Sequence, residues 1–167
     1  MYNNIGIEEG YLKKKSGHRI LVIQSRLKDA KFITDSIREK YPDMKLVTFD
    51  NLHSAFHEVV HSEYDLVLLD CEIEGLQKFG GIKLFKSFND KVPIITTCTP
   101  EQRFAGLRSV VEGADNYYII RYDYQRMLCK IVAISLHLIS PLDAIRDNIA
   151  KENKNLIGKE DPRPVAH

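Results

Sequence analysis

The sequence has no apolar run approaching the roughly 20 residues that a membrane-spanning helix needs, and its first ten residues lack the apolar centre of a signal peptide. Nor does one charge dominate, because 24 lysines and arginines balance 23 aspartates and glutamates, for a net charge of +1. Such a balance gives no long-range attraction to nucleic acid or to anionic membranes. The sequence therefore predicts a cytoplasmic protein, with neither a membrane nor a nucleic acid as the direct partner of this domain.

Cysteine is scarce, and its spacing excludes two kinds of site. The three residues Cys71, Cys98 and Cys129 form neither a CxxC pair nor a zinc-ligand spacing. An odd number of cysteines suits free thiols in a reducing compartment, so we expect no structural zinc. Glycine is also missing from Gln24–Lys28, the segment after the first predicted strand. This argues against a P-loop or a dinucleotide-binding site there.

Short apolar runs alternate with amphipathic segments from residue 19 to residue 139. Apolar residues repeated at helical spacing indicate helices, and compact β-branched runs indicate strands. We predict strands at 19–24, 45–49, 66–70, 93–98 and 117–120, with helices at 27–40, 52–60, 82–88, 100–113 and 127–139 between and after them. Because the strands are almost wholly apolar, the sheet is predicted to be parallel and covered by helices on both faces. The predicted fold class is α/β, a doubly wound five-stranded sheet with the favoured order 2-1-3-4-5.

The chain is predicted to have four parts. Residues 1–17 form a lead-in, 18–140 the domain, 141–157 an amphipathic tail helix and 158–167 a disordered tail. The tail helix carries apolar residues at heptad-like spacing, namely Leu142, Ile145, Ile149 and Leu156. A helix of this length is not stable alone. Three alternatives stay open for it: packing on its own domain, a homodimer seam, or a stalk to a module outside this sequence.

Asp70 is the most informative residue. It ends the apolar run 66–69 and begins a loop, so it is expected at the ligand-binding edge of the sheet. The order of elements, Asp70 and the stretch Gly113–Tyr117 together resemble response-regulator receiver domains over residues 18–140. The resemblance implies a flavodoxin-like fold and a site where an aspartate takes a phosphoryl group from a histidine kinase. It places Asp70 at the phosphoacceptor position and Tyr117 at that of an aromatic residue that often reports activation.

The same resemblance implies two acidic residues after the first strand, and this chain has Gln24 and Ser25 there. Mg²⁺ prefers near-octahedral oxygen ligation through carboxylates and neutralises charge on the transferred group. Both residues are neutral, so we expect no metal at this site. The next acid, Asp29, is expected to face solvent.

Two further departures concern the ends of the fourth and fifth strands. The family's hydroxyl residue aligns with Cys98, which is preceded by Thr97, and its lysine aligns with Ile120. Arg121 follows Ile120. Because arginine pairs well with carboxylates, we expect an Arg121–Asp70 ion pair in place of the family's lysine contact.

These departures predict a degenerate receiver, or pseudo-receiver: a signalling module, not an enzyme, that acts through protein–protein contacts and needs no cofactor. The expected partner surface is the face of the fourth helix, fifth strand and fifth helix, or the tail helix. One alternative is a working two-component receiver in a phosphorelay, phosphorylated on Asp70 with Mg²⁺. Another is a small flavodoxin-like enzyme or a thiol-based redox switch using Cys71 and Cys98. A third is the sensory part of a longer regulator.

Three histidines on one predicted helix, the histidine stripe, admit two interpretations. His53, His57 and His61 recur every four residues on one predicted helix. Two histidines at this spacing can bind zinc, but no third ligand is evident. We expect a polar, half-exposed flank of the helix.

Overall fold

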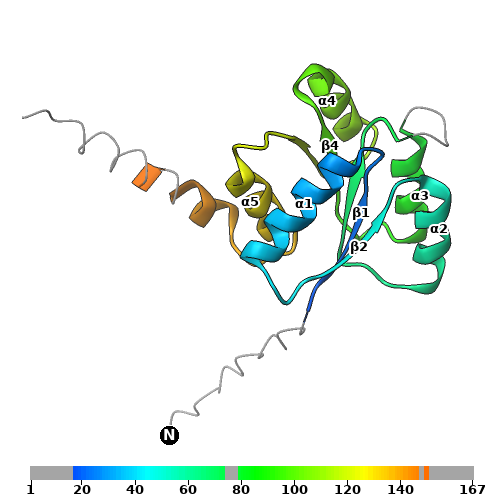
Figure 1. Ribbon diagram of the computed structural model, residues 1–167, viewed down its shortest axis with the longest axis horizontal. Helices are drawn as coiled ribbons and strands as arrows, with labels where there is room; N and C mark the ends of the chain where they lie inside the picture. Colours follow the sequence, from blue (N-terminus) through cyan, green and yellow to red (C-terminus); the bar gives the residue numbers. More distant parts are fainter. Residues whose placement is uncertain (1–16, 74–78, 147–148, 151–167) are drawn as a thin grey trace, which may run out of the picture.

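The computed structural model describes residues 17–73, 79–146 and 149–150. From Arg19 to Ser135, five strands alternate with five α-helices (Figure 1). The strands are β1 (Arg19–Ile23), β2 (Lys45–Phe49), β3 (Leu66–Asp70), β4 (Ile94–Cys98) and β5 (Asn116–Ile119). The helices are α1 (Leu27–Lys40), α2 (Leu52–His61), α3 (Gly80–Phe88), α4 (Arg103–Val111) and α5 (Gln125–Ser135), with a 3₁₀ turn η1 (Pro100–Gln102) before α4. All neighbouring strands pair in parallel in the order β2-β1-β3-β4-β5, which confirms the predicted fold.

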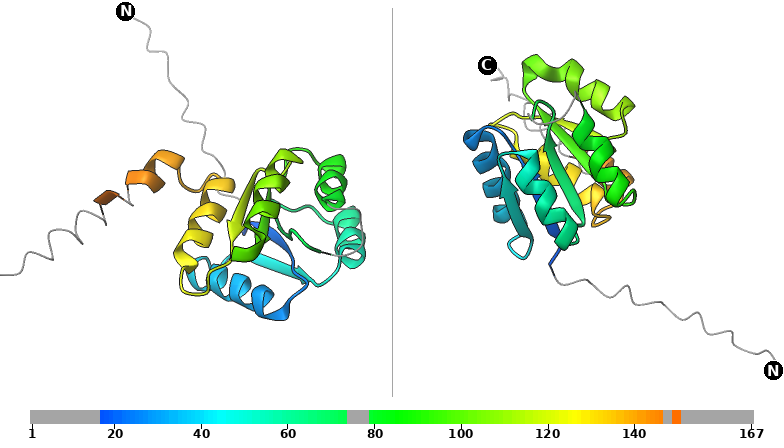
Figure 2. Two further views of the ribbon diagram at one scale, coloured as in Figure 1. Left: turned by 90° about the horizontal axis from the view of Figure 1, so that it is seen from above. Right: turned by 90° about the vertical axis from the view of Figure 1, so that its right-hand side faces the viewer.

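Helices cover both faces of the sheet (Figure 2). Because side chains alternate along a strand, each strand contributes to two cores. On one face Ile20, Val22 and Leu68 pack with residues of α1 and α5, and on the other Leu21 and Leu69 pack with α2 and α3. Each fully buried aliphatic side chain of this kind contributes about 1.5–3 kcal/mol. This double burial explains why the central strands are apolar along their length.

Helix α5 ends earlier than predicted, at Ser135 and not at residue 139. His137 has a left-handed backbone with φ of 54°. The amide of His137 donates to the carbonyl of Ile134 at 3.0 Å, and that of Leu138 donates to Ala133 at 2.8 Å. These two bonds form a Schellman motif, which ends a helix whatever its apolar pattern. Apolar spacing beyond residue 135 therefore marks packing, and not continuation of α5.

The chain resumes a helix at residues 141–146. Ser140 caps it, because its hydroxyl accepts a hydrogen bond from the amide of Asp143 at 3.1 Å. Lys130 of α5 donates to the carbonyl of Ala144 at 3.2 Å. Leu142 and Ile145 remain exposed. The lead-in and the remainder of the predicted tail helix lie outside the described residues, so the four-part division stays a prediction. Within the described residues, no helix is long and apolar enough to cross a membrane.

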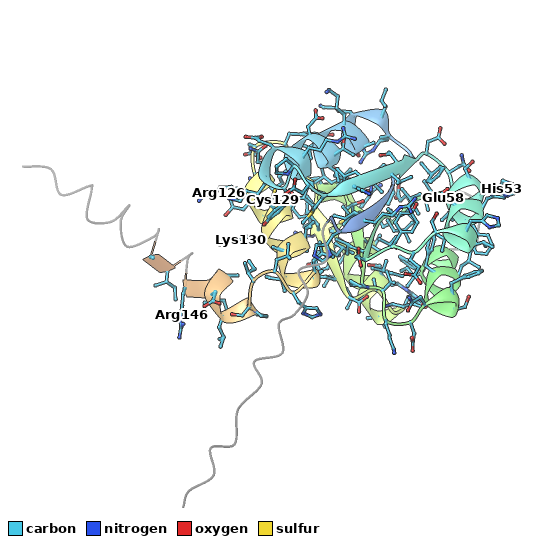
Figure 3. All side chains as sticks on the ribbon, turned by 90° about the horizontal axis from the view of Figure 1, so that it is seen from below. His53, Glu58, Arg126, Cys129, Lys130 and Arg146 are labelled. Atoms are coloured by element: carbon cyan, nitrogen blue, oxygen red, sulfur yellow. The ribbon has the colours of Figure 1, made fainter. Side chains whose placement is uncertain are left out.

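The histidine stripe lies on the solvent side of α2. Figure 3 shows His53 on the outer side of this helix, and all three histidines are exposed. The rings of His57 and His61 lie 5.2 Å apart, edge to face. The described residues contain no group of three or more His, Cys, Asp or Glu side chains placed to hold a metal ion. We therefore describe the histidine stripe as a polar flank of α2.

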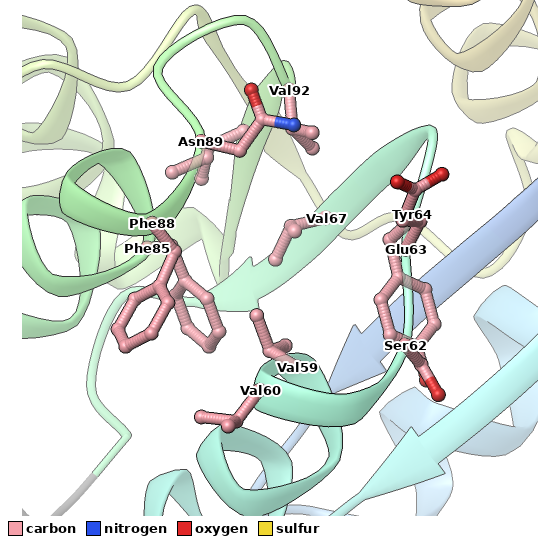
Figure 4. A pocket seen from close by; sticks show the side chains of 11 residues that line it. Val59, Val60, Ser62, Glu63, Tyr64, Val67, Phe85, Phe88, Asn89 and Val92 are labelled. Carbon is pink, nitrogen blue, oxygen red and sulfur yellow. The ribbon is translucent and has the colours of Figure 1, made fainter.

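A cavity of about 280 Å³ lies between α2 and α3, near the start of β3. Figure 4 shows Phe85 and Phe88 of α3 on one side and Val59 and Val60 of α2 on the other. Tyr64 closes a third side and is itself buried. The buried ring leaves its hydroxyl as the group that must find a polar partner.

Tyr64 finds that partner on α2. Its hydroxyl donates to Glu58 at 2.9 Å, and Arg19 donates to the same carboxylate oxygen at 3.0 Å. Burial, together with the hydrogen bond to Glu58, raises the pKa of Tyr64 from 10.0 to about 12. A raised pKa means that the folded state favours the neutral phenol. The stability that the neutral Tyr64 phenol gives the folded state is therefore complete below pH 10 and is lost as the pH approaches 12.

We therefore expect the free energy of unfolding to fall more steeply between pH 10 and pH 12 in the wild-type protein than in Tyr64→Phe. The phenylalanine variant keeps the ring and has no proton to lose. Urea unfolding at several pH values measures the difference between the two proteins. Parallel curves across this window would contradict the assignment.

Candidate functional site

The carboxyl ends of three strands bring most of the predicted site residues to one edge of the sheet. Gln24 and Ser25 follow β1, and Asp70 is the last residue of β3. Asp70 lies in register with Thr97 of β4, and Cys98 ends that strand. In an open parallel sheet this edge is the usual place for ligands and reacting groups.

Asp70 is almost completely buried, with 5% of its surface exposed. Its Oδ2 accepts two hydrogen bonds from Ser25, one from the hydroxyl at 2.6 Å and one from the amide at 3.2 Å. Its Oδ1 accepts a third, from the amide of Glu72 at 3.0 Å. The chain itself thus supplies donors to both oxygens of the carboxylate. Asp70 joins the start of α1 to the loop that follows β3.

Gln24 turns away from Asp70 and toward β4. Its side chain is 2% exposed, and its Nε2 donates to the hydroxyl of Thr97. The hydroxyl nearest to Asp70 in the strand register is therefore engaged by an amide. Among the described residues, no hydrogen-bond donor contacts Oε1 of Gln24.

Comparison with known proteins gives a consistent result. No family model matches the chain. Curated relatives do match, among them the transcriptional regulatory protein CusR of Escherichia coli K12 and the probable transcriptional regulatory protein SilR of Salmonella typhimurium. Each is 23% identical over 116 residues, which cover 68% of this chain and 49% of the relative. The chain spans about half the length of the curated relatives it matches.

Solved structures agree with this chain over its sheet and helices. The receiver domain of NtrX from Brucella abortus superposes with a TM-score of 0.63 at 16% identity, covering 71% of this chain and 98% of that one. A putative response regulator from Chloroflexus aurantiacus gives 0.65 at 14% identity, covering 72% and 98%. The chain has the receiver fold of response regulators. In this fold Asp70 occupies the end of the third strand, where the sequence resemblance places the phosphoacceptor.

The residues at the acidic-pair positions do not fit Mg²⁺, and the described residues contain no group of three or more His, Cys, Asp or Glu side chains that could hold a metal ion. The ion favours carboxylate oxygens in near-octahedral geometry. At the positions of the acidic pair, Gln24 and Ser25 offer neutral groups, and both donors of Ser25 point at Asp70. A cation at Asp70 would have to compete with three hydrogen bonds, and the two carboxylates of an acidic pair after β1, which would offset this cost, are missing.

The expected Arg121–Asp70 ion pair is wrong. Arg121 lies on the surface with its side chain 63% exposed, and its Nε is 3.8 Å from Oδ1 of Asp123. Ile120 takes the inward position at the end of β5, where its amide donates to the carbonyl of Cys98 at 2.8 Å. Its side chain is buried in the core beside α1 and α5. Since side chains alternate along a strand, an inward Ile120 turns the next residue outward.

The expectation that Asp29 faces solvent is also wrong. Its carboxylate is 1% exposed and pairs with Arg26, while the hydroxyl of Tyr122 donates to its other oxygen. This hydrogen bond to Asp29 is the main cause of the raised pKa of Tyr122, and burial raises that pKa further. The Tyr122 ring also packs edge to face on Phe32, with centroids 5.2 Å apart. The cluster joins the loop after β5 to α1.

Sequence reasoning missed this cluster. The signal available was the i, i+3 spacing of Arg26 and Asp29 in the first helical turn, where an acid is favoured by the helix dipole. The aromatic partner comes from a loop 93 residues away and carries no local signal.

Cys98 points to the face of the sheet opposite Asp70. Its thiol lies 3.7 Å from the carbonyl of Tyr118 and beneath Gly106 of α4. Tyr117, at the position of the activation-reporting aromatic, also lies against Gly106. The alignment of Cys98 with the family's hydroxyl therefore does not bring its thiol to Asp70. It brings the thiol under α4.

A cavity of about 350 Å³ opens beside Asp70. It is lined by Ser25, Arg26, Asp50, Asn51, Asp70, Glu72 and Gln102. Its lining includes three carboxylates, and its cation is Arg26, which already pairs with buried Asp29. The arrangement places Asp70 near solvent while keeping its own oxygens in hydrogen bonds.

Proposed function

We propose that this chain is a receiver-type signalling module that acts through protein–protein contacts, without Mg²⁺-dependent phosphorylation. One observation carries the proposal. Both oxygens of Asp70 accept hydrogen bonds from Ser25 and Glu72, at the place where a metal and a phosphoryl group would need them. The missing acidic pair and the buried Ile120 in the lysine position support the same conclusion. In this proposal Asp70 has a structural role.

The unusual surface of α4 supports a protein partner. The residues of this helix that are buried against the sheet are small, Gly106 and Ser109. Its large apolar residues face solvent instead, and they are Phe104, Leu107, Val110 and Val111. Phe104 is 68% exposed and Val111 86%. Contiguous exposed apolar residues of this kind favour an interface.

The relatives suggest a setting for the module. CusR and SilR are named as transcriptional regulatory proteins. By analogy we propose a cytoplasmic two-component pathway, in which this domain contacts a protein and any DNA binding belongs to another module.

The direct test of the proposal is phosphoryl transfer. We expect no gain of a phosphoryl group on the full chain after incubation with acetyl phosphate and Mg²⁺, as measured by intact mass at neutral pH. The reason is that no acidic pair is present to hold the ion between donor and Asp70. A working receiver treated in parallel serves as the positive control.

Stoichiometric phosphorylation of the wild-type chain that disappears in Asp70→Asn would overturn the proposal and support the working receiver. Phosphorylation that persists in Asp70→Asn would point to another residue.

The partner surface has its own test. Proteins recovered by a two-hybrid screen with the wild-type chain are retested against two double variants, Phe104→Ser with Val111→Ser on α4 and Leu142→Ser with Ile145→Ser on the tail. We expect the α4 variant to lose binding at least about tenfold, because an apolar anchor at an interface contributes 1.4 kcal/mol or more. The tail variant should keep it.

The control for folding is the melting temperature of each variant, since all four residues are exposed. Loss of binding in the tail variant alone would show that the tail, and not α4, forms the interface.

A further inference from the structure

Cys71 and Cys98 lie side by side at the ends of two neighbouring strands. The last register pair of β3 and β4 is Asp70 with Thr97, and the amide of Cys71 continues the ladder by donating to the carbonyl of Thr97 at 2.9 Å. The two cysteines are therefore the next pair across the strands. Neighbouring strands lie about 4.8 Å apart, inside the range of Cα separations that a disulfide spans.

The side chains also point the same way. Along β4, Thr96 contacts Ser109 of α4, and Cys98, two residues later, lies under Gly106 of the same helix. Alternation along β3 places Cys71 on this face too, where its Sγ is 3.9 Å from Oε1 of Gln102. The thiols contact each other: the hydrogen bond between them raises the pKa of Cys71 and lowers that of Cys98.

The pair differs from the third cysteine in access. Cys71 is half-buried and reachable from solvent, whereas Cys98 is 1% exposed behind it. Cys129 is buried on α5, between that helix and α1, where its thiol donates to the carbonyl of Ser36 at 3.3 Å. An oxidant can therefore meet Cys71 first. Access and not acidity selects Cys71, because its raised pKa disfavours the thiolate, whereas the lowered pKa of Cys98 favours it as the attacking thiolate of the resolving step.

We propose that Cys71 and Cys98 form a reversible disulfide on exposure to a hydroperoxide, and that this bond is a modification site coupled to Asp70 and to α4. The hydroperoxide transfers one oxygen to the sulfur of Cys71, giving a sulfenic acid and releasing water or an alcohol. The sulfur of Cys98 then attacks the sulfenic sulfur, and its proton leaves with the hydroxyl group as water. Two thiols are oxidised by two electrons, and one peroxide is reduced.

The position of the bond gives it consequences. Cys71 lies between Asp70 and Glu72, whose amide holds Oδ1 of Asp70. Its neighbour Gln102 accepts from Cys71 and also holds the amide of Thr99 at 2.8 Å, which caps the turn leading into α4. A sulfur–sulfur bond removes the thiol proton that Gln102 accepts and fixes the loop after Asp70 to the end of β4. The redox state of the pair thus reaches both the Asp70 site and the start of α4.

The test treats the full chain with a small excess of hydrogen peroxide and counts thiols after denaturation. The reduced protein has three free thiols, and we expect the count to fall to one. Peptide mapping should place the bond between residues 71 and 98 within one chain, and dithiothreitol should restore all three thiols. Cys129→Ser is the matched control, and we expect it to oxidise at the wild-type rate.

A second measurement tests whether the disulfide affects the loop after Asp70 and the start of α4. In the oxidised protein, we expect amide resonances of Glu72 and Gln102 to shift, while that of Lys40, at the end of α1 and the opposite edge of the sheet, stays in place. Cys71→Ser and Cys98→Ser should each abolish the shift and leave two thiols that do not pair. The proposal is overturned if Cys71 is oxidised further without pairing, if the bond joins two chains, or if Cys129 enters it. Because mapping of the wild-type protein decides these outcomes, the test holds even if Cys98→Ser fails to fold. The phosphoryl-transfer result has no bearing on it.

Discussion

Asp70→Asn should lower the free energy of unfolding by about 2 kcal/mol, the cost of leaving a buried donor without an acceptor. The carboxylate accepts on both oxygens, two hydrogen bonds from Ser25 on one and one from Glu72 on the other. An amide has a single acceptor oxygen, so in either orientation its NH₂ faces an N–H or O–H donor. Urea unfolding measures the loss, which corresponds to a drop in melting temperature of roughly 4–8 °C.

This result would separate a structural aspartate from one in a cluster of acids. Where two carboxylates of an acidic pair face the aspartate directly, removing one negative charge relieves repulsion and stabilises the fold. Asp123→Asn is the matched control, because its side chain is 77% exposed and pairs loosely with Arg121. Its unfolding free energy should stay within about 0.5 kcal/mol of wild type. An Asp70→Asn protein as stable as wild type, or more stable, would contradict the structural role.

Gly106→Ala should destabilise the protein by about 1–3 kcal/mol, through overpacking between α4 and the sheet. A Cβ at this position would lie 2.7 Å from Cδ2 of Tyr117 and 2.8 Å from Sγ of Cys98. Real contacts of this kind are longer, so the helix or its two neighbours must move. The loss should be seen even though alanine gains roughly 1 kcal/mol over glycine in a helix. Thermal and urea unfolding both measure it.

Gly81→Ala on α3 is the matched helical control. The nearest atoms to a Cβ there are the methyl ends of Leu52 and Leu69, at 3.3–3.5 Å. Such ends can shift by a few tenths of an ångström, so we expect this variant to be neutral or more stable. If both alanine variants behaved alike, the close approach of α4 to the sheet would not be the cause.

The sequence predicted the fold well because its strongest signal is local. Runs such as 66–69 are apolar on both faces, and that pattern, with a turn signal after it, is typical of a strand covered on both sides. The same argument placed Asp70 at the functional edge. Strand ends shifted by a residue, since hydrogen bonding and apolar content do not stop at the same place.

The site was harder to predict because its contacts depend on one-residue alternation and on distant partners. Arg121 and Ile120 are adjacent, and only the register of β5 decides which of them faces inward. Asp29 is buried because Tyr122, which lies 93 residues later in the sequence, covers it. Neither fact follows from composition or spacing within a single element.

The way α4 rests on the sheet separates two demands on its sequence. Its inner side uses a glycine and a hydroxyl, so the large apolar residues on its outer side contribute little to folding. If α4 carries the partner surface proposed above, positions 104, 107 and 111 can change residue type under selection for recognition alone. A lineage could then change the partner of this domain without first acquiring spare stability, and its specificity would evolve faster than its scaffold.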